Sequence, residues 1–121
     1  MKVIRKDQST KEDLTDAPIF FGGRVTLQNI VGKEMNRFYN FTLVSFEAGA
    51  RNKFHAHTSD QVLYVTEGAG IVVTEEEEVP IKEGDTAWIP AGEKHWHGAS
   101  PDSNFTHISL QTADSTTAIL E

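Results

Sequence analysis

The sequence predicts an all-β domain, a sandwich or small barrel for which the jelly roll is the natural arrangement. Three observations support this prediction. About eight or nine short segments with strand character follow one another closely, no segment has a convincing helical pattern, and glycine or proline separates the segments regularly. Because a jelly roll places strands that are distant in sequence side by side, we expect distant segments to meet in one barrel.

Composition predicts one soluble globular domain. The chain has 121 residues, of which 38% are hydrophobic and 24% are charged. It has no apolar run long enough to span a membrane, and its charged amino terminus lacks the apolar core of a signal peptide. We therefore expect a cytoplasmic protein without a membrane partner.

The charge and the missing cysteines exclude several kinds of chemistry. A formal net charge of -7 argues against a nucleic-acid partner, because phosphate binding needs a basic surface. The acidic run 75–78 is typical of a solvated loop or sheet edge. Without cysteine the chain has no disulfide, no thiolate ligand and no cysteine nucleophile. A bound metal would therefore be held by nitrogen and oxygen atoms.

The first part of the chain divides into an arm and the start of the barrel. Residues 1–18 are polar and aperiodic, and we expect them to form an arm that pairs with a neighbouring sheet or subunit. The barrel domain is predicted over 19–121. Its first strand, 24–31, alternates polar and apolar residues, and its second strand is 38–47. In this second strand, alternation places one set of side chains on a common face: Thr42, Val44 and Phe46.

The middle and last strands follow with clear turn signals. Residues 51–57 and the nearly continuous apolar run 61–66 are predicted strands, and 67–70 reads as a tight hairpin connection into the next strand. The remaining predicted strands are 86–89, stopped by Pro90, then 95–98 and 104–112. The tail beyond them is expected to fray.

Two histidines are spaced like a pair of metal ligands. On a strand, residues two apart project to the same face, so His55 and His57 point the same way. An isolated His-x-His pair is more often a surface or core feature than a metal site. Here Gln61 adds an oxygen donor at the start of the next strand, and His95 follows an array of glycines and a proline that imposes sharp turns. Imidazole suits Zn, Cu, Fe and Ni, and oxygen donors bring in Mn.

These residues match a known family. The pattern Gly49-x5-His55-x-His57-x3-Gln61-x6-Gly68 resembles the first cupin motif, and Gly84-x5-Pro90-x-Gly92-x2-His95 resembles the second. The resemblance covers roughly residues 38–112. It implies a cupin double-stranded β-helix, usually a homodimer, with one divalent metal ion per chain. The implied ligands occupy four positions: His55, His57, Gln61 and His95.

The chain departs from the family pattern at two positions. Gln61 stands where the family usually has glutamate, and Ala99 stands where it has asparagine late in the second motif. A neutral amide leaves a divalent site one unit more positive, so metal affinity falls while Lewis acidity rises. In the alternative reading, Gln61 only packs and Asp60 or a water completes the shell. Alternation along the strand places Asp60 on the opposite face.

The match narrows to small bacterial single-domain cupins. Residues 45–51, 90–101 and 106–111 resemble those that include manganese-dependent hydroxynitrile lyases, which carry glutamine at the fourth ligand position. The resemblance implies manganese, with iron, nickel or zinc as alternatives. It also implies that His97 and His107 lie beside the metal. One of them would accept a hydroxyl proton as a carbon–carbon bond breaks, and the other, protonated, would steady the leaving anion.

Which of the two histidines takes which role stays open, and each has an alternative reading as a packing or orienting residue. The barrel mouth is predicted to be lined by five residues: Thr42, Val44, Phe46, Trp88 and Gln111. Trp88 and Trp96 are alternatively plain core residues.

Two other functions compete with a lyase that acts on a small molecule. Cupins with three histidines and one further ligand include iron- or nickel-dependent dioxygenases, but losing an anionic ligand disfavours an oxidised metal. A non-catalytic cupin that binds a small molecule around a structural metal is the other alternative. A fold alone does not decide the reaction.

Overall fold

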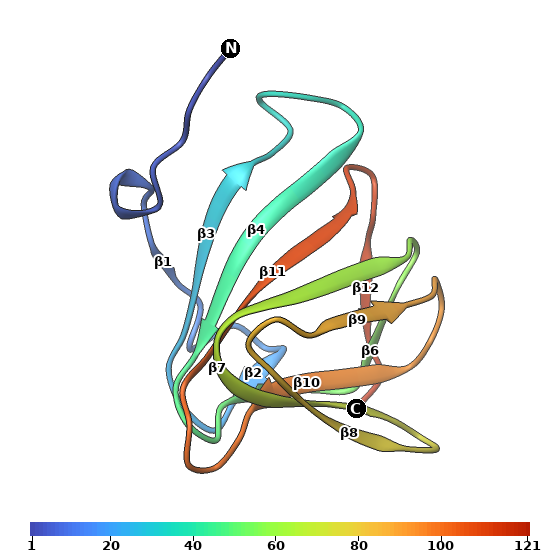
Figure 1. Cartoon of the computed structure of the whole chain (residues 1–121). Coiled ribbons are helices and arrows are strands. Elements are labelled where there is room, and N and C mark those ends of the chain that lie inside the picture. Colours follow the sequence, from blue (N-terminus) through green and yellow to red (C-terminus); the bar gives the residue numbers. More distant parts are fainter.

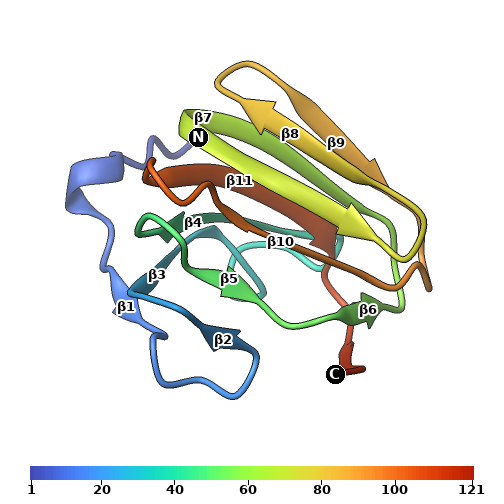
Figure 2. The same ribbon diagram turned by 90° about the horizontal axis from the view of Figure 1, so that it is seen from below.

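The computed structural model describes residues 1–121 and shows a curled sheet of short strands without an α-helix (Figures 1 and 2). One 3-10 turn and twelve strands follow in order: η1 Lys6–Gln8, β1 Glu12–Asp13, β2 Phe20–Phe21, β3 Val25–Val31, β4 Tyr39–Phe46, β5 Arg51–Asn52, β6 His55–His57, β7 Gln61–Thr74, β8 Glu78–Lys82, β9 Thr86–Ile89, β10 His95–Ala99, β11 Phe105–Thr112 and β12 Thr117–Ile119. The predicted all-β jelly roll is confirmed. No helix in the structure has the length and apolar character needed to cross a membrane.

Strand β7 belongs to both layers of the barrel. Its first half pairs with β11 and β9, and its second half pairs with β10 and β8. The hairpin that the sequence predicts at 67–70 is therefore wrong, because the strand continues and bends instead of reversing. Gly68 has a φ of 73°, and a Cβ there would lie 1.8 Å from the carbonyl oxygen of Asn104. Only glycine fits this close approach.

The strands pair antiparallel in two runs that face one another. One run has the order β1-β3-β4-β11-β7, and β9 pairs with the far side of β7. The other contains β8, the second half of β7, β10, β5 and β2, with β6 also on β10. In β4, Val44 and Phe46 are buried, and in β11 so are His107 and Ser109. Alternating positions of these strands therefore point between the runs.

A cluster of buried apolar side chains fills one end of the space between the runs. Its most enclosed large side chains, each with an exposed fraction of at most 2%, are Val25, Phe46, Leu63, Val65 and Phe105. Burying side chains of this size contributes roughly 1.5–3 kcal/mol each. The polar residues described below occupy the other end.

Both ends of the chain pair with its own sheet. In the arm, β1 pairs with β3, and the Gln28 side chain donates a hydrogen bond to the carbonyl of Lys6 at 2.8 Å. The tail does not fray as the sequence suggests, because β12 pairs with β6 and covers its free edge. The Glu121 carboxylate fastens this tail by accepting from the Arg51 guanidinium at 3.0 Å and from the Phe54 N–H at 2.9 Å. The acidic run 75–78 is exposed, as predicted.

Candidate metal centre

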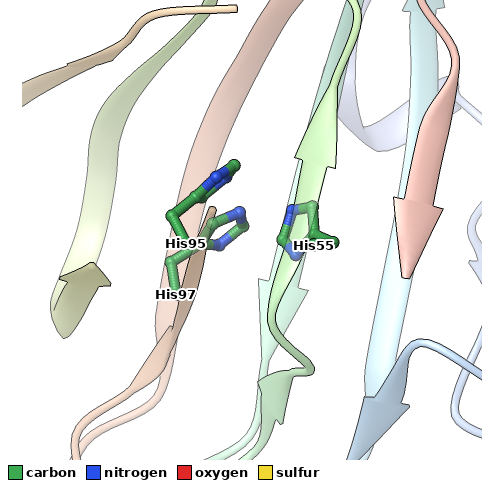
Figure 3. A group of neighbouring side chains, drawn as sticks. All are labelled: His55, His95 and His97. Atoms are coloured by element: carbon green, nitrogen blue, oxygen red, sulfur yellow. The ribbon is translucent and has the colours of Figure 1, made fainter. Parts of the chain in front are cut away.

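All five histidines of the chain gather between the two runs of strands. His55 and His57 come from β6, His95 and His97 from β10, and His107 from β11. His55 and His95 are direct partners in the β6–β10 pairing, and their ring centroids are 4.3 Å apart. Figure 3 shows His55 facing His95 and His97 across the gap between their strands. The register of short strands therefore brings the two histidine stretches together.

Three of the imidazoles form a group that could hold a metal ion. His55, His95 and His97 each offer one ring nitrogen, and these nitrogens lie within 4.8 Å of one another. The His57 ring is also near, with its centroid 4.8 Å from that of His55 and 5.5 Å from that of His95. Geometry alone thus leaves two choices for the third imidazole.

Hydrogen bonds determine which nitrogens have a free lone pair. The Nδ1 of His55 lies 2.7 Å from the Lys53 carbonyl, and the Nδ1 of His95 lies 2.8 Å from the Glu93 carbonyl. A carbonyl only accepts, so both Nδ1 atoms carry hydrogen and both Nε2 atoms carry a lone pair. The Nδ1 of His57 lies 2.8 Å from the Thr117 hydroxyl, and its buried Nε2 has no protein partner.

The side-chain oxygen of Gln61 lies beside the Nε2 atom of His95. Its amide nitrogen donates to the Ser109 hydroxyl at 2.9 Å, and its Oε1 lies 3.2 Å from the Nε2 of His95. Because Nδ1 of His95 holds the proton, this short contact joins two lone pairs with no hydrogen between them. A cation bound by both atoms would relieve the repulsion. We call His55, His57, Gln61 and His95 the convergent group.

The alternative in which Asp60 replaces Gln61 finds no support in its contacts. Its two carboxylate oxygens accept from the Trp88 indole at 3.1 Å and from the Ala91 N–H at 2.8 Å.

His97 and His107, which we call the inner pair, lie deeper, with ring centroids 4.9 Å apart. The Nδ1 of His107 donates to the Ile108 carbonyl at 3.0 Å, which leaves a lone pair on its buried, unpartnered Nε2. Nε2 of His97 contacts the Asn52 amide nitrogen at 3.2 Å, and its Nδ1 is buried without a partner. Sequence reasoning missed Asn52, because the irregular step between β5 and β6 hides its orientation.

Burial keeps these histidines neutral. It lowers the pKa of His55 to about 3 and that of His57 to about 4, and neighbouring imidazoles add to both shifts. Burial also lowers the pKa of His107 to about 4 and lowers the pKa of His95 and of His97. At neutral pH all five rings are therefore uncharged, which is the state in which imidazole binds a metal.

A cavity of about 480 Å³ is lined by His55, His57 and Gln61 of the convergent group and by both histidines of the inner pair. Of the residues predicted at the barrel mouth, Thr42, Val44 and Gln111 line it, and the buried Nε2 of Gln111 has no protein partner. Phe46 belongs to the packed core instead and meets the rings of the inner pair from that side, at 5.8 to 5.9 Å.

The two tryptophans lie outside the cavity. Trp88 is 65% exposed with its indole bonded to Asp60, so its predicted place at the barrel mouth and its reading as core are both wrong. Its strand presents Trp88 on the outer side of the sheet, whereas its neighbour Ile89 is buried. Trp96 lies under the Arg51 guanidinium, whose carbon is 3.7 Å from the ring centroid.

Comparisons with known proteins agree with this fold. A family model described as the cupin domain matches residues 42–108. The (R)-mandelonitrile lyase of Granulicella tundricola is 46% identical over 69 residues, which are 56% of this chain and 53% of that enzyme. This chain thus spans about half the length of that relative.

Solved structures with the same fold extend over nearly the whole chain. A cupin-like protein of Thermotoga maritima superposes with a TM-score of 0.82 and 27% identity, over 99% of this chain and 89% of that one. The polyketide cyclase RemF of Streptomyces resistomycificus superposes with a TM-score of 0.87 over 100% of this chain and 86% of its own, at 17% identity.

Proposed function

The chain belongs to the cupin family, and from that premise we propose that it is a metal-dependent lyase that cleaves small hydroxynitriles. Its four proposed ligands are the convergent group, which would hold one divalent ion, manganese by preference. The observation that carries this proposal is the unprotonated contact between Gln61 Oε1 and His95 Nε2 at 3.2 Å. Two hydrogen-bond acceptors are tolerated at this distance in a buried site when a cation joins them.

The hydrogen bonds favour His57 over His97 as the third imidazole. His57 has a buried Nε2 without a partner, whereas the Nε2 of His97 already faces an amide N–H of Asn52. The choice of a lyase over an oxidising cupin rests on Gln61, because neutral ligands alone disfavour a higher oxidation state of the metal. The activity of the 46% identical relative supports the same choice.

The residues of the inner pair suit a proton transfer. When bound, a divalent ion would act as a Lewis acid that lowers the pKa of a nearby hydroxyl. His107 has its Nδ1–H tied to a carbonyl, so its Nε2 lone pair is available to accept the hydroxyl proton. The carbon–carbon bond to the nitrile then breaks, which leaves an aldehyde and cyanide. His107 returns its proton to cyanide, and the atoms balance as aldehyde plus hydrogen cyanide.

The neutral state of the inner pair refines the expectation that one member is protonated. Burial lowers the pKa of both rings, so neither is a cation at neutral pH. Any contact from His97 to a leaving anion would therefore be an N–H hydrogen bond from a neutral ring.

The experiment combines metal analysis with two assays on one preparation. We expect about one divalent ion per chain, release of benzaldehyde from (R)-mandelonitrile, and no oxygen consumption. His107→Gln should keep the metal and lose the cleavage, because glutamine cannot accept the proton. Oxygen uptake without cleavage would favour a dioxygenase, and a full complement of metal with neither activity would favour a binding protein.

A further inference from the structure

Asn52 uses both ends of its side-chain amide on a single residue, His97. Its Oδ1 accepts a hydrogen bond from the His97 backbone N–H at 2.8 Å, and its Nδ2 lies 3.2 Å from the His97 Nε2. Asn52 is 4% exposed, and His97 is 3% exposed. A buried amide with both ends engaged has one orientation available to it.

This orientation fixes the proton on the His97 ring. A backbone N–H can only donate, so the amide atom that it contacts is the oxygen, and the amide nitrogen must face the ring. The amide nitrogen is itself a donor, so the Nε2 of His97 must accept. A neutral imidazole carries one hydrogen, which here lies on Nδ1. That Nδ1 is buried and has no acceptor among the protein atoms.

Close packing of the neighbouring backbone maintains this contact. Strand β5, which carries Asn52, pairs with β10 through Arg51 and Gly98. A Cβ at Gly98 would lie 2.6 Å from the carbonyl oxygen of Ala50 and 2.6 Å from the Cα of Arg51. The glycine therefore lets β5 approach β10 closely enough for the Asn52 amide to meet the ring.

We propose that Asn52 is a positioning residue that holds His97 as its Nδ1–H tautomer. His97 is then a hydrogen-bond donor to a bound small molecule and does not bind the metal. In this tautomer neither ring nitrogen has a free lone pair for a cation. The role of His97 toward the substrate rests on the proposed function. In that role the Nε2 of His107 accepts a hydrogen bond from the substrate, and the Nδ1–H of His97 donates one to it. The two rings lie 4.9 Å apart and both line the cavity. A hydroxynitrile fits this pair, because its hydroxyl donates and its nitrile nitrogen accepts.

The tautomer can be read directly by imidazole nitrogen NMR on 15N-labelled protein loaded with zinc, which does not broaden the signals. The His97 signals are identified by their loss in His97→Gln. In the wild-type protein we expect hydrogen on Nδ1 and none on Nε2. Asn52→Asp replaces the donor with an acceptor of equal size, so hydrogen should move to Nε2. Asn40→Asp adds the same charge at the same cavity without a contact to the ring, and it should leave the tautomer unchanged.

Activity separates this inference from the proposed function. Asn52→Asp should slow mandelonitrile cleavage by about 10- to 100-fold, the usual effect of changing a residue that orients a functional side chain. The metal content should stay unchanged. A wild-type spectrum with hydrogen on the Nε2 of His97 overturns the inference whatever the activity, and it does not depend on whether Asn52→Asp folds. A spectrum with hydrogen on Nδ1, in a protein whose manganese-loaded form shows no cleavage, upholds the role of Asn52 and overturns the lyase.

Discussion

Comparing the convergent group with the inner pair shows that His97 alone has the opposite ring nitrogen held by a neighbour. In the convergent group, carbonyls hold the Nδ1–H of His55 and of His95, so their Nε2 lone pairs point into shared space. In the inner pair, the Ile108 carbonyl holds Nδ1 of His107, whereas the Asn52 amide holds Nε2 of His97. The group at the far nitrogen thus decides whether a histidine offers a lone pair or an N–H.

Lowering the pH should have the broadest effect, because it protonates histidines of the convergent group and of the inner pair. The unfolded chain takes up protons near pH 6.5, but the pKa of His57 and of His107 is lowered to about 4 in the folded protein. Between these values the unfolded state binds more protons, so stability falls as pH decreases from 6.5 towards 4. Each such histidine contributes about 1.4 kcal/mol per pH unit.

Denaturant unfolding of the metal-free protein across this pH range tests the expectation. His107→Gln is the matched variant, because it removes one titrating ring and should make the dependence shallower by about 1.4 kcal/mol per pH unit. A stability that does not change between pH 6.5 and 4 would contradict neutral burial of these rings.

Removing one imidazole from the convergent group should have the largest effect on metal binding. We expect His95→Ala, and likewise His55→Ala, to lower metal affinity by more than about 100-fold, beyond the loss from changing an orienting residue. Elemental analysis and calorimetric titration measure this. His97→Gln is the control from the same strand and should keep the metal. Full metal occupancy in both alanine variants would refute the ligand assignment.

An intermediate effect is expected at Thr117, whose hydroxyl contacts His57 Nδ1 at 2.8 Å. Thr117→Val keeps the shape and removes this partner, so metal affinity should fall by about 10- to 100-fold. Thr117→Ser keeps the hydroxyl and should recover most of the affinity in the same titration. If valine and serine behave alike, the hydroxyl does not orient His57.

The smallest effect of the series, and the only gain, is expected at Gln61. Gln61→Glu replaces a neutral oxygen donor with an anionic one, so we expect metal affinity to rise by about tenfold or less while the fold is kept. The Ser109 hydroxyl that now accepts from the amide can donate to the carboxylate. Unchanged metal affinity would place Gln61 outside the ligand set.

The sequence predicted the fold and the meeting of the two histidine stretches, because fixed spacings between glycines and histidines reflect local turns and strand alternation. It could not predict the path of β7 at Gly68, since a glycine with positive φ serves a hairpin and a bend equally well. It also placed Trp88 on the wrong face, because a four-residue strand gives too little alternation to orient a side chain.

Two partners of the site escaped prediction for a different reason. Asn52 precedes an irregular step in the chain, where alternation gives no information about direction. Thr117 lies in a polar tail without strand periodicity, and its pairing with β6 depends on a contact between residues 60 positions apart. Long-range contacts of this kind are determined by the assembled barrel and leave no local pattern.

The pairing of β12 with β6 also has a consequence for synthesis of the protein. The strand that carries His55 and His57 leaves the ribosome well before Thr117, which follows His57 by 60 residues. Until then, one edge of β6 is open and the His57 ring lacks its hydroxyl partner. Strand β11, which lies between β4 and β7, is also made only shortly before β12. The nascent chain therefore completes its barrel and the surroundings of His57 at nearly the same moment, when these last strands have been translated.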